Sequence, residues 1–295
     1  SAMVPVAARA RSKRKQDTGE AETPVAPIVI REFPRPNGEN YIGRKLGTGL
    51  DVEVCQAARV NSLPVLLYGA PGTGKTALLE AAFAFESGGL HTVSGSADTE
   101  RSDFVGSYVQ APDGKFIWVD GPLIKAMEAG GVLFIDEIAL IDPKVLSTVY
   151  SVMDGRGEVV VTENPERGVV KAKEGFYVVG ACNPNVPGAR MSEALVSRFT
   201  VQAEYTTDYA LAKKLGVPSK FVTAAKNLET KRVNDEVSWA PQMRECLAFA
   251  KVHTAFGEAM ALRNLVAVAP EIDRDTVAAV LSTAFGTPVE ARKGE

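Results

Sequence analysis

The sequence has few of the residues that build disulfide frameworks or zinc sites. It contains three cysteines and two histidines, which are Cys55, Cys182, Cys246, His91 and His253. An odd number of cysteines at scattered spacings favours reduced thiols over disulfide bonds, and two histidines far apart do not supply the clustered ligands of a zinc site. We therefore expect a protein of a reducing compartment, the cytoplasm.

Long apolar runs and a strong charge imbalance are missing as well. Apolar stretches such as residues 132–135 are far shorter than the roughly 20 residues that cross a bilayer, and we recognise no signal peptide. The formal net charge of −3 does not favour a polyanion as the main partner. Because 45% of the residues are apolar, the chain can bury the core of one large domain or two smaller ones. We expect a globular protein without membrane contact.

The N-terminal segment differs in composition from the rest of the chain. Ser1, Ala2 and Met3 resemble the remnant of a removed tag, and the following residues are rich in alanine, proline and charge. The basic residues between Arg9 and Lys15 could form a nucleic-acid-binding arm, but a solvated tail is the simpler interpretation. We predict that residues 1–27 are disordered and that residues 1–40 form a tail and lead-in.

Apolar runs that alternate with helical segments predict a parallel α/β core over residues 41–206. The first predicted elements are a helix over residues 44–60, a strand over 64–68 and, after a glycine-rich turn, a helix over 76–85. Further strands are predicted over residues 90–93, 132–135, 176–181 and 199–203, and further helices over 123–128 and 143–153. This alternation indicates a parallel sheet flanked by helices.

After residue 206 the pattern becomes purely helical. Helical periodicity covers residues 210–215, 219–230, 241–253, 257–268 and 273–285. We therefore predict a small helical domain over residues 207–295, and we find no internal repeat in either domain.

The glycine-rich turn has the pattern of a phosphate-binding loop. Two glycines flank four residues and are followed by lysine and threonine, in the run Gly69, Ala70, Pro71, Gly72, Thr73, Gly74, Lys75, Thr76. In such a loop the backbone N–H groups and the helix N-terminus bind phosphates, the lysine reaches the β and γ phosphates, and the threonine binds Mg²⁺. A chance glycine turn is the alternative. The strand before the turn and the helix after it favour binding of ATP with Mg²⁺.

An acidic pair, Asp136 and Glu137, directly follows the apolar run of residues 132–135. The pair is therefore expected at the carboxyl edge of the sheet, where open α/β sheets bind ligands. We expect Asp136 to hold Mg²⁺ and Glu137 to orient the attacking water. The pair could instead cap the following helix, but the phosphate-binding loop about 60 residues earlier favours a catalytic role.

With these motifs the sequence resembles the AAA+ ATPases, and within them the MoxR branch that includes the CbbQ, NorQ, CobS and GvpN types. The resemblance covers roughly residues 40–290 and also rests on residues 103–108, 120–123, 182–185 and 192–199. It implies an AAA+ P-loop core and a small C-terminal helical lid domain. It also implies a homo-oligomeric ring, a hexamer, in which ATP hydrolysis remodels a partner protein or loads it with metal. Relatives commonly work with a partner that has a von Willebrand factor A domain.

The resemblance also implies roles for three further polar residues. Asn183 resembles sensor 1, which helps to position the attacking water, although an Asn-Pro turn is the alternative. Arg198 matches the arginine finger, which reaches the nucleotide of the neighbouring subunit. A helix C-cap or a surface ion pair is its alternative role, and Arg190 is a nearby competitor for the finger. Arg244 resembles sensor 2, although the sequence departs there from the compact Ser-x-Arg form.

Two insertions are predicted to form β-hairpins. The first covers residues 109–118 around a Pro-Asp-Gly turn. Its Phe116 and Trp118 could touch a substrate or pack the hairpin onto the core. The second hairpin is indicated by residues 158–161 and 169–172. In the family, hairpins of this kind line or rim the ring and engage partners.

Two other functions are compatible with parts of the sequence. One is a nucleic-acid motor or loader in which the segment from Arg9 to Lys15 and the hairpins grip a phosphate backbone. ATP turnover that DNA stimulates and that falls steeply with salt would favour it. The other is an ATP-binding switch that scarcely hydrolyses, and the presence of both Glu137 and Arg198 argues against it.

Overall fold

The computed structural model describes residues 31–291 of the 295-residue chain. The predictions for residues 1–27, including the disordered tail and the basic segment from Arg9 to Lys15, lie outside the described residues.

A five-stranded parallel sheet forms the centre of the α/β core, in the order β13-β5-β12-β9-β6. Its strands are β5 (Val65–Tyr68), β6 (Leu90–Ser94), β9 (Val132–Asp136), β12 (Tyr177–Cys182) and β13 (Val201–Glu204). The three central strands are continuous apolar runs, as expected for parallel strands that are covered on both faces. The predicted strands and the predicted fold class are confirmed.

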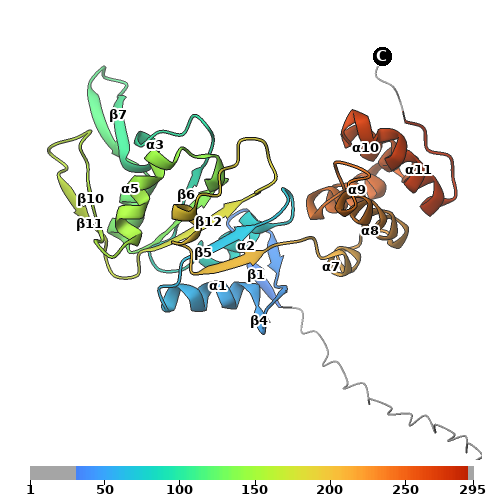
Figure 1. Cartoon of the computed structure of the whole chain (residues 1–295), viewed down its shortest axis with the longest axis horizontal. Helices are drawn as coiled ribbons and strands as arrows, with labels where there is room; N and C mark the ends of the chain where they lie inside the picture. Colours follow the sequence, from blue (N-terminus) through green and yellow to red (C-terminus); the bar gives the residue numbers. More distant parts are fainter. Residues whose placement is uncertain (1–30, 292–295) are drawn as a thin grey trace, which may run out of the picture. The chain divides into compact units, whose positions relative to one another are not determined.

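Helices cover both faces of this sheet (Figure 1). They are α1 (Asp51–Val60), α2 (Lys75–Phe83), α3 (Ser102–Val105), α4 (Pro122–Ala129), α5 (Pro143–Met153) and α6 (Glu193–Val196). Successive side chains of a strand point to opposite faces. In β9, Leu133 and Ile135 join the core cluster with α4 and α5, whereas Val132 and Phe134 join the cluster with α1 and α2.

The prediction that a helix over residues 44–60 is the first ordered element was wrong. Two short antiparallel pairs precede α1: β1 (Glu32–Pro34) with β2 (Asn40–Ile42), and β3 (Lys45–Leu46) with β4 (Gly49–Leu50). Gly47 turns the chain between β3 and β4 with a φ of +59°, a conformation that a right-handed helix cannot contain. The helix therefore begins only at Asp51.

Both predicted hairpins are confirmed. The first pairs β7 (Gly106–Gln110) with β8 (Phe116–Asp120), and the second pairs β10 (Glu158–Val160) with β11 (Val169–Lys171). Trp118 packs against the core, lies edge-on to Tyr108 and donates a hydrogen bond of 2.7 Å to Asp120. Phe116 is 69% exposed. Of the two aromatic side chains, only Phe116 is free to touch a partner.

The C-terminal part of the described chain is helical. Its helices are α7 (Tyr209–Lys214), α8 (Ser219–Val233), α9 (Met243–Phe256), α10 (Glu258–Val268) and α11 (Arg274–Phe285). They enclose a separate apolar core, in which the rings of Phe221 and Phe249 stack at a centroid distance of 3.9 Å. Among the helices of residues 31–291, none is both long enough and apolar enough to span a membrane.

We predict that Phe249→Ala destabilises the helical part by about 3–5 kcal/mol, because it removes a fully packed ring from the stack with Phe221. Phe256→Ala, in the same helix, is the matched control. Its ring is 71% exposed, so its loss should change stability by less than about 0.5 kcal/mol. Thermal unfolding followed by circular dichroism measures both effects. Equal effects of the two substitutions would contradict the assigned core.

Candidate nucleotide-binding site

The glycine-rich loop connects β5 to α2, and its backbone conformation requires glycine. Gly69, Gly72 and Gly74 have φ values of +149°, +79° and +101°, which side chains disfavour. A Cβ atom on Gly69 would also lie 2.4 Å from the carbonyl oxygen of Tyr205. The loop therefore lies directly against the chain that leaves β13, and N–H groups at a helix start such as that of α2 have the geometry to bind an anion.

Lys75 begins α2 and folds back over the loop. Its side-chain Nζ donates hydrogen bonds to the carbonyl oxygens of Gly69 at 2.7 Å and Ala70 at 3.0 Å. Burial lowers the pKa of Lys75, and the nearby carboxylates of Glu137 and Asp136 act in the opposite direction. A bound anion beside the ammonium group would add to the effect of the carboxylates and favour the charged form.

Thr76 and Asp136 lie side by side although 60 positions separate them. The Thr76 hydroxyl donates to an oxygen of Asp136 at 3.2 Å. Mg²⁺ in proteins is commonly held by one or two carboxylates together with substrate phosphates. Among residues 31–291, no group of three or more His, Cys, Asp or Glu side chains forms a metal-ligand cluster. The hydroxyl and the carboxylate thus fit Mg²⁺ that is shared with a nucleotide.

Glu137 occupies a left-handed backbone conformation with φ +46° and ψ +39°. Such conformations cost energy for a residue other than glycine and cluster at functional sites. Its side chain makes no capping hydrogen bond to the short helical turn Ile138–Leu140 that follows. The carboxylate instead accepts a hydrogen bond of 3.3 Å from the backbone N–H of Asn183. The alternative role of Glu137 as a helix cap therefore has no support.

Asn183 follows β12, the neighbour of β9, and reaches the same edge of the sheet. Its side-chain oxygen accepts a hydrogen bond of 3.1 Å from the backbone N–H of Asn185, which closes the Asn-Pro turn considered as its alternative role. The turn and the proximity to Glu137 occur together, because the turn presents the backbone N–H of Asn183 to the Glu137 carboxylate.

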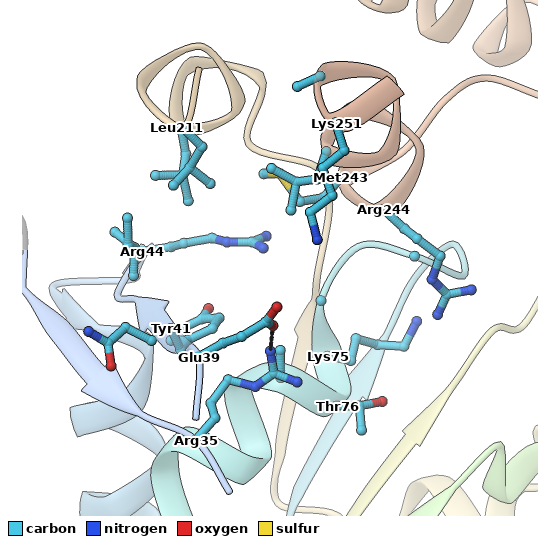
Figure 2. Close-up of a pocket in the computed structure, with 18 of the residues that line it drawn as sticks. Arg35, Glu39, Tyr41, Arg44, Lys75, Thr76, Leu211, Met243, Arg244 and Lys251 are labelled. Atoms are coloured by element: carbon cyan, nitrogen blue, oxygen red, sulfur yellow. Dashed lines mark hydrogen bonds and ion pairs between the residues drawn. The ribbon is translucent and has the colours of Figure 1, made fainter. Parts of the chain in front are cut away.

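Arg244 comes from the first turn of α9 and meets the loop from the helical side. Its backbone N–H donates to the carbonyl oxygen of Gly72 at 3.0 Å. The start of α9 is fixed by a capping box between Gln242 and Glu245. Figure 2 shows the guanidinium of Arg244 on the same side of the cavity as Lys75. The structure thus places Arg244 beside the P-loop despite its unusual sequence spacing.

One cavity of about 1160 Å³ is lined by Gly72, Gly74, Lys75, Thr76, Asp136, Glu137 and Arg244, and Asn183 contacts Glu137 from outside this lining. Part of the cavity wall was not predicted from the sequence. It is formed by Arg35 and Glu39 before β2, Tyr41 in β2, Arg44 after β2 and Lys251 in α9 (Figure 2). No local motif identifies these residues, since only the folded chain brings them to the loop. Two charged side chains that line the wall, Arg35 and Glu39, form an ion pair of 3.1 Å.

Arg198 does not line this cavity. It lies two residues after the end of the short helix α6, and its guanidinium forms a bidentate ion pair with Asp154 at 3.0 and 2.8 Å. It also donates to the carbonyl oxygen of Ala194 and lies 4.3 Å from the ring centroid of Tyr150. Within one chain Arg198 therefore has the surface ion pair considered as its alternative role. Its competitor Arg190 is exposed.

Comparisons with known proteins agree with this geometry. Residues 64–199 match the model of the AAA domain (dynein-related subfamily). An uncharacterized protein of Staphylococcus haemolyticus (strain JCSC1435) is 36% identical over 148 residues, which are 48% of this chain and 55% of that protein. An uncharacterized protein of Staphylococcus aureus (strain USA300) is 36% identical over 143 residues, which are 46% and 53% of the two chains. The chain thus spans about half the length of the curated relatives that it matches.

A solved structure from Cytophaga hutchinsonii ATCC 33406 covers 69% of this chain and 73% of its own. At 17% identity and a TM-score of 0.44 it is too distant to inform function. The matched domain extends from the strand before the P-loop to the residue after Arg198. Over residues 64–199, which include the P-loop and the acidic pair, this chain is similar to the AAA domain of the dynein-related subfamily.

Proposed function

We propose that this chain binds ATP with Mg²⁺ and hydrolyses it to ADP and phosphate. The observation that carries the proposal is the convergence of three groups in one cavity: the P-loop with Lys75, the pair of Thr76 and Asp136, and Glu137 beside Asn183. Each group has the chemistry that one part of phosphoryl transfer to water needs.

The loop and Lys75 would bind the phosphates. The carbonyl oxygens of Gly69 and Ala70 hold the Lys75 ammonium over the loop, so a bound triphosphate can replace them as its partner. Thr76 and Asp136 would hold Mg²⁺, which when bound neutralises charge on the β and γ phosphates. Burial of Lys75 strengthens its attraction for phosphate because the local dielectric constant is low.

Glu137 would act on the attacking water. The Asn183 N–H fixes one carboxylate oxygen of Glu137, which leaves the other oxygen to accept a hydrogen bond from a water molecule in line with the γ phosphate. Attack by this water breaks the bond between the β–γ bridging oxygen and the γ phosphorus. Hydrogen bonding to Glu137 orients the water and polarises it as the new P–O bond forms.

We further propose that the active form is a ring, a hexamer of the MoxR type, in which Arg198 acts on the nucleotide of the neighbouring subunit. The exclusion of Arg198 from the cavity of its own chain supports action in trans. Arg198 would have to exchange Asp154 for the γ phosphate of the neighbour. Both partners are anionic and match the planar guanidinium group.

The work of this ring would be the remodelling of a partner protein, for example one with a von Willebrand factor A domain. The first hairpin supports a protein client, because both of its strands expose large apolar side chains, among them Tyr108, Phe116 and Ile117. An exposed apolar surface of this kind is typical of protein contacts. A polyanion would instead require a basic surface.

We predict that Lys75→Ala weakens ATP binding by about tenfold to a hundredfold or more, because the phosphates lose a charge-assisted hydrogen bond. Isothermal titration calorimetry with ATP and Mg²⁺ measures the affinity. Lys115→Ala, at the exposed tip of the first hairpin, is the control and should bind as the wild type does. Unchanged affinity in Lys75→Ala would contradict the assigned P-loop.

We predict that Glu137→Gln still binds ATP but hydrolyses it about 10² to 10⁴ times more slowly. The amide oxygen can still accept the Asn183 N–H, so the fold of the site is retained, but the carboxylate that polarises the water is lost. Phosphate release under saturating ATP measures the rate. Hydrolysis at the wild-type rate would remove Glu137 from the mechanism.

We predict that Arg198→Ala binds ATP nearly normally and hydrolyses it about 10³ to 10⁵ times more slowly. Mixing Arg198→Ala subunits with Lys75→Ala subunits tests action in trans, because some interfaces then pair an intact P-loop with an intact arginine. The mixture should regain a fraction of wild-type turnover. If the two proteins co-assemble and turnover does not return, Arg198 is not the trans-acting group and Arg190 becomes the candidate.

A further inference from the structure

Arg44 is a buried cation in the wall of the nucleotide cavity. It lies between β2 and β3 and is only 9% exposed. Figure 2 shows its guanidinium pointing into the cavity, on the side away from Lys75 and Arg244. None of the roles in ATP binding and hydrolysis proposed above involves Arg44.

Two tyrosine rings and one carboxylate hold Arg44 in this position. The guanidinium carbon lies 4.8 Å from the ring centroid of Tyr205 and 5.9 Å from that of Tyr41. Asp51 accepts hydrogen bonds from the backbone N–H of Arg44 and from both tyrosine hydroxyls. These three hydrogen bonds to Asp51 hold the Arg44 backbone and both tyrosine rings in place. The Arg44 side chain therefore has a defined position before a ligand binds.

The Arg44 guanidinium has few hydrogen-bond acceptors around it. Its one hydrogen bond within residues 31–291 runs from Nη1 to the carbonyl oxygen of Thr206 at 3.3 Å. The buried Nε has no partner among these residues, and none of their ion pairs includes Arg44. Buried donors without acceptors destabilise a fold. An anion in the cavity would supply the missing acceptors.

The position of Arg44 along the P-loop indicates which part of a nucleotide it meets. A Cβ atom on Gly74 would lie 2.7 Å from Nη2 of Arg44, so the guanidinium lies against the loop just before Lys75. Figure 2 shows the Arg44 guanidinium on the opposite side of the cavity from Thr76, which would share Mg²⁺ with Asp136. Arg44 therefore lies away from the hydrolytic end. In a P-loop the backbone cradles the α and β phosphates, and the lysine reaches the β and γ phosphates.

We propose that Arg44 is a nucleotide-binding residue that contacts the α phosphate, the group that ATP and ADP share. This inference rests on the proposed function of the cavity. It adds a role distinct from those of Lys75 and Arg244. Hydrolysis leaves the α phosphate unchanged, so Arg44 binds the nucleotide both before and after the reaction. It does not distinguish ATP from ADP by the γ phosphate.

The test is Arg44→Met, which keeps the length of the side chain and removes its charge. Affinities for ADP and for ATP should fall by the same factor, about tenfold to a hundredfold. CDP should lose the same factor, since it carries the same diphosphate on a different base. A loss confined to adenine nucleotides would place Arg44 on the base and overturn the assignment to phosphate.

Thermal unfolding without nucleotide separates binding from structure. Because the buried guanidinium has one long hydrogen bond, no ion pair among residues 31–291 and an unpartnered Nε, Arg44→Met should leave the Tm unchanged or raise it. Arg59→Met is the matched control. The Arg59 guanidinium donates to the carbonyl oxygens of Ser87, Gly130 and Gly175, outside the cavity lining, so its loss should lower the Tm and leave nucleotide affinity unchanged.

The outcomes are distinguishable. If Arg44→Met lowers the Tm as Arg59→Met does and binds ADP as the wild type does, Arg44 is structural and the inference fails. If the wild-type protein binds neither ADP nor ATP, the proposed function fails first. Should Arg44→Met not fold, Arg44→Lys keeps the charge without the planar group. It should then bind ADP and ATP more weakly than the wild type by one common factor, and wild-type affinity would overturn the inference.

Discussion

The candidate site depends on the parallel register of three neighbouring strands. β5, β12 and β9 pair in parallel, with Tyr68 opposite Cys182 and Ile135 opposite Gly180. Because parallel strands end at the same edge, the loop after β5, the acidic pair after β9 and the turn after β12 must meet there. A hydrogen bond of 3.1 Å from the Gly69 N–H to the Cys182 carbonyl continues the ladder into the P-loop. If one of these three strands shifted along its neighbour, the groups that follow it would no longer lie at the same edge of the sheet.

Much of this arrangement is predictable because its signals are local. Apolar runs of four to six residues followed by glycine or carboxylates identify both the strands and the edge at which they end, so Lys75, Thr76, Asp136 and Glu137 follow from the sequence. The two hairpins follow from strand-forming residues around turn residues. The contact between Thr76 and Asp136 is a direct consequence of the parallel sheet that these patterns predict.

Sequence patterns do not reveal the part of the cavity wall that comes from the segment before α1. The residues before α1 were predicted as helix because apolar spacing alone does not register the left-handed turn at Gly47. Arg44 was the first residue of that predicted helix. Its burial depends on Tyr205, which lies 161 positions later in the chain. Likewise the bidentate pairing of Arg198 with Asp154 depends on how α6 packs beside α5. Neither helix encodes that packing locally.

At position 137 the left-handed backbone favours residues other than glutamate for stability, whereas the proposed activity requires the glutamate carboxylate. Asparagine and glycine accept this conformation with less strain than glutamate does, so variants selected only for resistance to heat would tend to replace Glu137. Such variants would retain the sheet and the P-loop and would lose the carboxylate that faces Asn183. Under the proposed function, the strain at Glu137 is the cost of placing a carboxylate beside the γ phosphate. A library of variants at position 137 could be sorted first for thermal stability and then for ATP turnover. The two sorts should enrich different residues at this position.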